Sequence, residues 1–135
     1  MTKFFTTAAF VLAMSTAAPA QALIPLHQEP TVRSMFYAIG LADEVRRNCP
    51  SISARMVRAY LYLRSIESYA RKAGYSEDQI RDLADNKAEK EKLRVVIRAD
   101  LSKRGVTPGS SDGYCKVGLE EIARGTASGR LLQAN

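Results

Sequence analysis

Residues 49–74 read CPSISARMVRAYLYLRSIESYARKAG and form the longest regularly spaced apolar stretch in the chain. Alternating steps of four and three place seven residues on one helical stripe: Ile52, Met56, Ala59, Leu63, Ile66, Ala70 and Ala73. Pro50 suits a first helical turn, and Gly74 suits the left-handed position after a helix end. We therefore predict that this stretch is the central helix. Between residues 56 and 63 apolar and aromatic side chains nearly fill the helical circumference, so we expect this half to be buried on all sides.

The N-terminal residues have the features of a signal peptide. Residues 4–28 contain no Lys, Arg, Asp or Glu, and Lys3 precedes this uncharged run. Ala20, Gln21 and Ala22 give the small-x-small pattern that a signal peptidase needs. We predict a signal peptide over residues 1–22, cleaved after Ala22, and a periplasmic or secreted protein. A membrane anchor is the alternative, because the uncharged run is just long enough to span a bilayer.

The remaining chain has the size of a single domain. Removing residues 1–22 from the 135-residue chain leaves 113 residues, and losing Lys3 takes the formal net charge from +6 to +5. Residues 23–30 contain Pro25 and Pro30 and are expected to be an extended, loosely held lead segment, followed by one helical domain over residues 31–135. A moderate positive charge favours solubility without selecting a partner. Because exported proteins rarely meet nucleic acid, we expect no nucleic-acid partner.

One helix is expected before the central one and another after it. Thr31 can cap a helix over residues 31–47, and the inward side chains of that helix would be Val32, Met35, Phe36, Ile39 and Ala42. After Gly74, Ser76 and Gln79 match a capping box, and Tyr75 and Ile80 stand where a hydrophobic staple would place them. These signals predict a new helix beginning at Glu77.

The rest of the chain adds one or two more helices. Asn86 and Glu89 form a second capping pair, which predicts a break and a new helix ending at Gly105. One continuous helix over residues 77–104 is the alternative. The last helix is expected over residues 113–124, with four buried residues: Cys115, Leu119, Ile122 and Ala123. No strand is predicted. Leu131 and Leu132 either dock or protrude, and we expect docking because adjacent exposed leucines favour aggregation.

Cys49 and Cys115 are the only cysteines, and both lie in the part expected to be exported. In an oxidising compartment a disulfide is the default for such a pair, and two buried free thiols are the alternative. On the chain-entropy view, closing a loop of this length stabilises the fold by about 4 kcal/mol. The predicted fold class is therefore all-α: a compact bundle of about four to five helices around a central helix, with one disulfide.

Several short motifs are similar to those of a known family. They are Asn-Cys-Pro-Ser at 48–51, Ala-Gly-Tyr-Ser at 73–76, Asn-Lys-Ala-Glu-Lys at 86–90, Tyr-Cys at 114–115 and Glu-Ile-Ala-Arg-Gly-Thr-Ala-Ser-Gly-Arg-Leu-Leu at 121–132. With these motifs the chain resembles a family of small exported alphaproteobacterial proteins classified only as a domain of unknown function. The resemblance covers most of the chain after residue 22. It implies a compact helical protein with Cys49 and Cys115 as its two cysteines, and it implies no activity.

The residue types needed for metal or nucleophile chemistry are scarce. The one histidine, His27, cannot supply a histidine-based metal site or a Ser-His-Asp arrangement, and the cysteines lack Cys-x-x-Cys spacing. We therefore expect no metal and no cofactor. Two carboxylate pairs remain, Asp43 with Glu44 and Glu120 with Glu121. Because adjacent residues on a helix point about 100° apart, we expect these pairs to be solvated charges.

One set of residues is a candidate partner-binding face. Arg55, Tyr62 and Tyr69 are spaced by seven residues and lie nearly in line beside the apolar stripe, with Arg58 nearby. Tyrosine and arginine are common at binding surfaces, although tyrosine beside an apolar stripe is more often the boundary of a core.

These observations favour a non-enzymatic envelope protein over an enzyme. We expect an adaptor or accessory binding protein whose partner is another envelope protein, with no requirement for membrane contact. The alternative is a hydrolase of cell-envelope polymers whose carboxylates are brought together by the fold.

Export with cleavage after Ala22 can be checked by mass. The intact mass of the protein recovered from the periplasm should correspond to a chain beginning at Leu23. A mass that retains residues 1–22 would contradict cleavage and support the membrane anchor.

Overall fold

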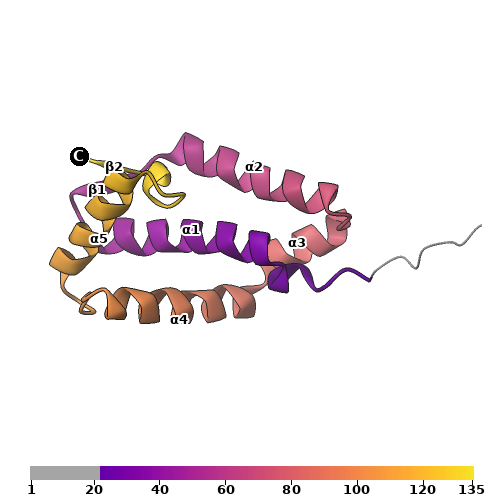
Figure 1. Cartoon of the computed structure of the whole chain (residues 1–135), viewed down its shortest axis with the longest axis horizontal. Helices are drawn as coiled ribbons and strands as arrows, with labels where there is room; N and C mark the ends of the chain where they lie inside the picture. The colour runs from indigo at the N-terminus through magenta and orange to yellow at the C-terminus, as the bar shows by residue number, and fades with distance from the viewer. Residues whose placement is uncertain (1–21) are drawn as a thin grey trace, which may run out of the picture.

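A computed structural model describes residues 22–135 as a bundle of helices joined by short turns (Figure 1). The predicted signal peptide lies outside the described residues except for Ala22. The described chain has five α-helices, two 3-10 turns and two short strands: Leu26–Gln28 (η1), α1 Pro30–Asn48, β1 Ile52–Ala54, α2 Met56–Lys72, α3 Glu77–Asp85, α4 Lys87–Lys103, α5 Ser111–Arg124, Gly129–Leu131 (η2) and β2 Leu132–Ala134. The prediction of an all-α bundle with about five helices is confirmed.

The central helix is α1. It lies between α2 and α4, and α5 crosses its C-terminal end (Figure 1). Six of its residues are buried: Val32, Ala38, Leu41, Ala42, Glu44 and Val45. In α2 only Ile66 and Ala70 are buried, so the prediction that residues 49–74 form the central helix is wrong. That stretch is also interrupted, because residues 52–54 are a strand and the helix begins at Met56.

The neighbours of α1 approach it closely where glycines face them. A Cβ atom at Gly40 would lie 2.4 Å from Cδ1 of Ile97 on α4. A Cβ at Gly118 of α5 would lie 2.6 Å from Cγ1 of Val45 and 2.5 Å from Cδ1 of Ile52. Because protein interiors are close-packed, these positions tolerate no added side-chain atom without movement of a neighbour. Both helix crossings therefore depend on glycines, which a search for apolar periodicity does not take into account.

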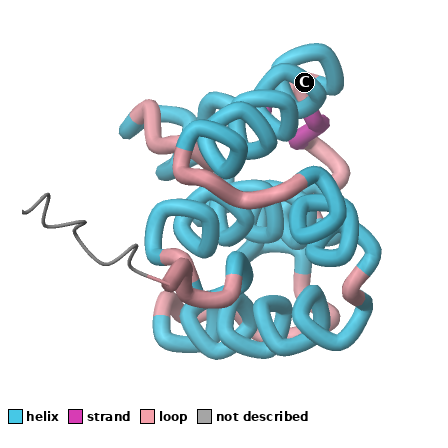
Figure 2. Tube along the Cα trace, turned by 90° about the vertical axis from the view of Figure 1, so that its right-hand side faces the viewer, coloured by secondary structure: helices cyan, strands magenta, loops and turns pink. Residues whose placement is uncertain are grey.

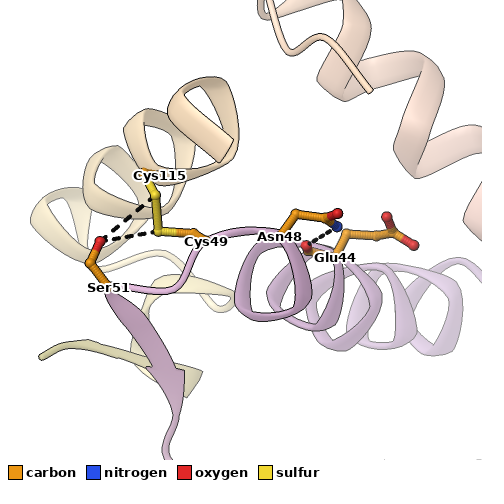
Figure 3. Close-up of a disulfide and its surroundings, with 5 residues drawn as sticks. All are labelled: Glu44, Asn48, Cys49, Ser51 and Cys115. Carbon is orange, nitrogen blue, oxygen red and sulfur yellow. Dashed lines mark hydrogen bonds between the residues drawn. A yellow bond between two sulfur atoms is a disulfide. The ribbon is translucent and has the colours of Figure 1, made fainter. Parts of the chain in front are cut away.

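The predicted disulfide is confirmed. Cys49, which follows the end of α1, bonds to Cys115 in the second turn of α5, and their Cα atoms are 5.1 Å apart. Figure 3 shows the Ser51 hydroxyl beside both sulfurs, 3.2 Å from Sγ of Cys49 and 3.7 Å from Sγ of Cys115. In the preceding turn the Asn48 amide donates a hydrogen bond of 2.8 Å to the carbonyl oxygen of Glu44. The bond therefore fixes α5 to the corner that follows α1.

The buried face of α5 differs from the predicted one. Leu119 is 50 % exposed, Ala123 is exposed, and Cys115 and Ile122 are only partly buried. The buried residues are Tyr114, Val117, Gly118 and Glu121, so the inward face is shifted by about one residue. The physical reason is the close approach at Gly118, which turns this side of the helix toward α1 and places Leu119 in solvent.

The helix starts were predicted correctly after residue 75. Ser76 and Gln79 form a capping box, with bonds of 2.9 Å and 3.2 Å between each side chain and the other residue's backbone N–H. The side chain of Asn86 accepts a 3.0 Å bond from the backbone N–H of Glu89. Residues 77–104 are thus two helices, α3 and α4, as the second capping pair indicates. At α1, in contrast, the cap is Glu29 and not Thr31.

The two ends of the described chain are docked on the body. Leu26 is buried, and the Tyr75 hydroxyl donates a 2.9 Å bond to the carbonyl of Ile24, so the expectation of an extended, loosely held lead is wrong. At the other end Leu131 and Leu132 are 4 % and 2 % exposed, which confirms docking. Within residues 22–135, no helix is both long and apolar enough to cross a bilayer.

The C-terminal residues form a strand pair that was not predicted. β2 pairs antiparallel with β1, and Ile52 lies opposite Ala134. Figure 2 shows the strands at the edge of the helical body, close to the C-terminus. Strands of three residues are too short to show an alternating pattern, which explains why the sequence did not reveal them.

Gly129 controls the docking of this C-terminal segment. A Cβ atom there would lie 1.9 Å from the carbonyl oxygen of Glu121, which belongs to the backbone of α5 and cannot move aside cheaply. We predict that Gly129→Ala lowers the free energy of unfolding by about 3 kcal/mol, measured by urea denaturation. Gly105→Ala is the control, because Gly105 has a φ of 85° but open space around it, and the expected loss there is about 1 kcal/mol. Equal losses would contradict the steric explanation.

Candidate partner-binding surface

The N-terminal half of α2 exposes a set of large apolar side chains. Met56, Val57, Tyr60, Leu61 and Leu63 are 71 %, 74 %, 62 %, 59 % and 41 % exposed. At 100° per residue, these five side chains occupy one side of the helix. We call this set the α2 apolar face. The expectation that this half of the helix is buried on all sides is therefore wrong.

The opposite side of α2 is the one that packs against the body. Its residues Tyr62, Ile66, Tyr69, Ala70 and Ala73 belong to, or contact, the apolar cluster that includes Val32 of α1. Compared with the predicted stripe, the inward side is rotated toward the two tyrosines and away from Met56 and Leu63. The sequence did carry a signal for the exposed face. Apolar residues lie around the whole circumference of this part of the helix, and a single packing partner can cover only one side of it.

Arginines border the α2 apolar face. Arg58 is exposed, and Arg64 is bound to Glu67 at 2.5 Å. Arg55 precedes the helix, and its backbone N–H donates a 2.8 Å bond to the carbonyl of Leu131, which ties the helix start to the C-terminal segment. Among residues 22–135, no carboxylate lies within ion-pair distance of Arg55 or Arg58. The border is therefore positively charged.

The structure places the predicted face Arg55, Arg58, Tyr62 and Tyr69 only partly at the surface. Tyr62 is half-buried and contacts two apolar clusters: the one that includes Val32, and a larger one that includes Val45 of α1 and Leu132. Burial raises the pKa of the Tyr62 hydroxyl, with a smaller opposite effect from Arg130. Both tyrosines lie on the inward side of α2, away from the α2 apolar face. Whether these four residues bind a partner stays a prediction. The rings of Tyr62 and Tyr69 also pack against the apolar core.

Tyr69 has a defined structural partner. Its hydroxyl donates a 3.2 Å hydrogen bond to Oε1 of Glu29, the residue that caps α1. Desolvation raises the pKa of Glu29, but hydrogen bonds from the backbone N–H of Val32 and Thr31 and from Tyr69 outweigh it, so the pKa is lowered. The carboxylate thus stays ionised while it joins α2 to the start of α1.

The first of the adjacent carboxylate pairs is held by arginines. Asp43 lies 2.6 Å from Nη2 of Arg46 on the same helix. Glu44 is buried, and its Oε1 lies 3.2 Å from Nη2 of Arg98 on α4. The two acids point to different partners, as expected for neighbours on a helix. The expectation that both pairs are solvated is wrong for Glu44 and for Glu121, because both side chains are buried against arginines.

The second carboxylate pair, Glu120 with Glu121, binds one arginine, Arg104. Nη1 of Arg104 lies 2.7 Å from Oε1 of the buried Glu121, and Nη2 lies 3.1 Å from Oε2 of Glu120. The hydroxyl of Thr126 donates to the other oxygen of Glu121. These acids therefore connect α4, α5 and the C-terminal segment. The part of the chain that the structure describes contains no group of three or more metal-ligating side chains.

Comparison with known proteins gives one match. A family model described as "Family of unknown function (DUF5333)" matches residues 24–133, which is most of the chain. No curated protein and no solved structure shows a significant match.

The two sides of α2 can be separated by a matched pair of tyrosine substitutions. Tyr62→Ser removes a half-buried ring between the two clusters, so the free energy of unfolding should fall by about 2 kcal/mol. Tyr60→Ser removes a ring that is 62 % exposed, and the expected change is within about 0.5 kcal/mol. Tyr and Ser have similar helix propensities, so urea denaturation of the two variants compares burial alone. A larger loss at Tyr60 would show that the α2 apolar face is not free.

Proposed function

We propose a binding role for this chain, which belongs to the DUF5333 family of unknown function. The protein is a non-enzymatic adaptor or accessory protein of the cell envelope, exported with a signal peptide that is cleaved after Ala22, and it acts in the periplasm or outside the cell. Its partner is another envelope protein. One observation carries the binding role: the α2 apolar face is held outward on a folded, disulfide-linked body.

Exposing the side chains of the α2 apolar face to water is unfavourable, and a binding role explains why they lie at the surface. Single exposed apolar residues are ordinary, but a contiguous group of them is typical of interaction sites. Met56 has a flexible, polarisable side chain that can adapt to a partner, and Leu61 adds a branched apolar side chain. Tyr60 supplies an aromatic ring of the kind enriched at interfaces. The residues lie on one helix, so the surface is already ordered before binding. Little conformational entropy is then lost on association.

The charge at the border specifies the chemistry of the partner. Arg55 and Arg58 have no carboxylate at ion-pair distance in the described residues, so they are available to a second molecule. We infer that the partner presents an apolar helix or groove bordered by Asp or Glu side chains. Such complementarity steers association and selects among partners more than it adds to affinity.

The hydrolase alternative receives less support. It needs two carboxylates that converge on one bond of the substrate. The adjacent acids instead each bind an arginine, Asp43 with Arg46, Glu44 with Arg98 and Glu121 with Arg104. These ion pairs give the acids a structural role, which favours the binding protein.

Site-specific photo-crosslinking in the native host tests the proposal. A photoreactive amino acid is placed at Leu61 or, as the control, at Val95 of α4, and both of these residues are 59 % exposed. We expect a discrete adduct with a single envelope protein from Leu61 only. Val57→Arg should reduce this adduct roughly tenfold by placing a charge in the apolar contact, and Arg58→Glu should weaken it most at low salt.

The control substitution is Val95→Arg, which puts the same charge on another exposed helix position and should leave the adduct unchanged. Equal adducts from Leu61 and Val95 would contradict a specific surface. An adduct with the mass of two copies of this chain would replace the envelope partner by self-association. Insensitivity to Arg58→Glu would refute an acidic border on the partner.

A further inference from the structure

A concave surface lies on the side of α1 away from α2, between α1, α3 and α4. It is a cleft of about 290 Å³. Its walls carry five apolar side chains: Val32 and Phe36 of α1, Leu83 of α3, and Leu93 and Val96 of α4. In Figure 1 α4 lies across α1 from α2, so this cleft and the α2 apolar face belong to different layers of the bundle.

The mouth of the cleft is positively charged. Arg33, Lys90 and Lys92 line it together with the single carboxylate of Glu89 and the ring of His27. Nζ of Lys92 lies 2.6 Å from Oε1 of Glu89, so these two charges largely neutralise one another. The hydrogen bond from Lys92 also lowers the pKa of Glu89, and the positive charges of Lys92 and Arg33 and the His27 ring contribute to that lowering.

Arg33 and Lys90 have no such partner. Among residues 22–135, no carboxylate lies within ion-pair distance of either side chain. Both are exposed at the mouth, one from α1 and one from α4. The site thus combines an apolar interior with two available cations at its entrance.

The geometry points to a binding site for a single-chain fatty acid, with the hydrocarbon chain between α1 and α4 and the carboxylate at Arg33 and Lys90. An apolar slot with a few polar groups at its entrance is the usual form of a small-molecule site. The volume of about 290 Å³ lies just below the usual range for such sites, roughly 300–1,000 Å³, which suits one short acyl chain and not the two chains of a phospholipid. Arginine and lysine at the mouth match a carboxylate and reject a cation.

Titration calorimetry with ligands of equal chain length tests the assignment. Decanoate, decanol and decyltrimethylammonium are added in turn to the purified protein. Decanoate should bind at least roughly tenfold more tightly than decanol, and the cation should bind weakest. Raising the salt concentration should weaken decanoate binding and leave decanol binding nearly unchanged.

Substitutions separate the head-group site from the apolar slot. Arg33→Gln and Lys90→Gln should each weaken decanoate binding several-fold without affecting decanol. Val96→Asp, at a wall residue that is 43 % exposed, should weaken binding of both ligands. Lys116→Gln is the matched control, because it removes an exposed positive charge on α5, a helix that does not line the cleft, and should change neither affinity. Circular dichroism of each variant confirms that it is folded.

Several outcomes would overturn the assignment. They are equal affinities for decanoate and decanol, loss of decanoate binding in Lys116→Gln, and no change in Arg33→Gln and Lys90→Gln. A further arm uses vesicles of phosphatidylglycerol. Binding to vesicles that depends on Arg33, in the absence of binding to decanoate, would assign the site to a membrane surface and refute the fatty-acid site.

Discussion

The close crossing of α5 over the end of α1 is the contact on which the rest of the structure depends. It is possible because position 118 is glycine, and any Cβ there would overlap Val45 and Ile52. The same approach brings the Cα atoms of Cys49 and Cys115 to 5.1 Å, within reach of a disulfide. It also presents the backbone of Glu121 as the surface on which Gly129 rests. Three features of the fold therefore follow from one missing side chain.

The predictions that succeeded concern either helix caps, which depend on a few neighbouring residues, or the pairing of the only two cysteines. Capping by Ser76 and Asn86 is decided within one helical turn, so tertiary packing does not override it. The two cysteines can pair in only one way within the chain, and the expected export to an oxidising compartment made the disulfide the expected state. Both kinds of signal are complete in the sequence, which explains their accuracy.

The predictions that failed concern which side of a helix faces which neighbour. The length of its apolar stretch selected α2 as the central helix. The central helix is instead α1, and its Gly40 lets Ile97 of α4 approach it closely. The candidate surfaces show the same limit. The α2 apolar face is exposed only because α2 packs by its other side, and the cleft combines residues of α1, α3 and α4 that no spacing rule connects. Such sites are properties of the assembled bundle.

The pairing of β1 with β2 joins the middle of the chain to its last residues. β2 is synthesised long after β1, so the backbone groups of Ile52–Ala54 have no native strand partner on a nascent chain that has not yet reached Leu132. The helices between them can form earlier, because their hydrogen bonds are local. Closure of the body at this strand pair is therefore a late step, because it needs residues 132–134. A chain that stops a few residues short lacks β2 and leaves β1 open to pairing with other chains.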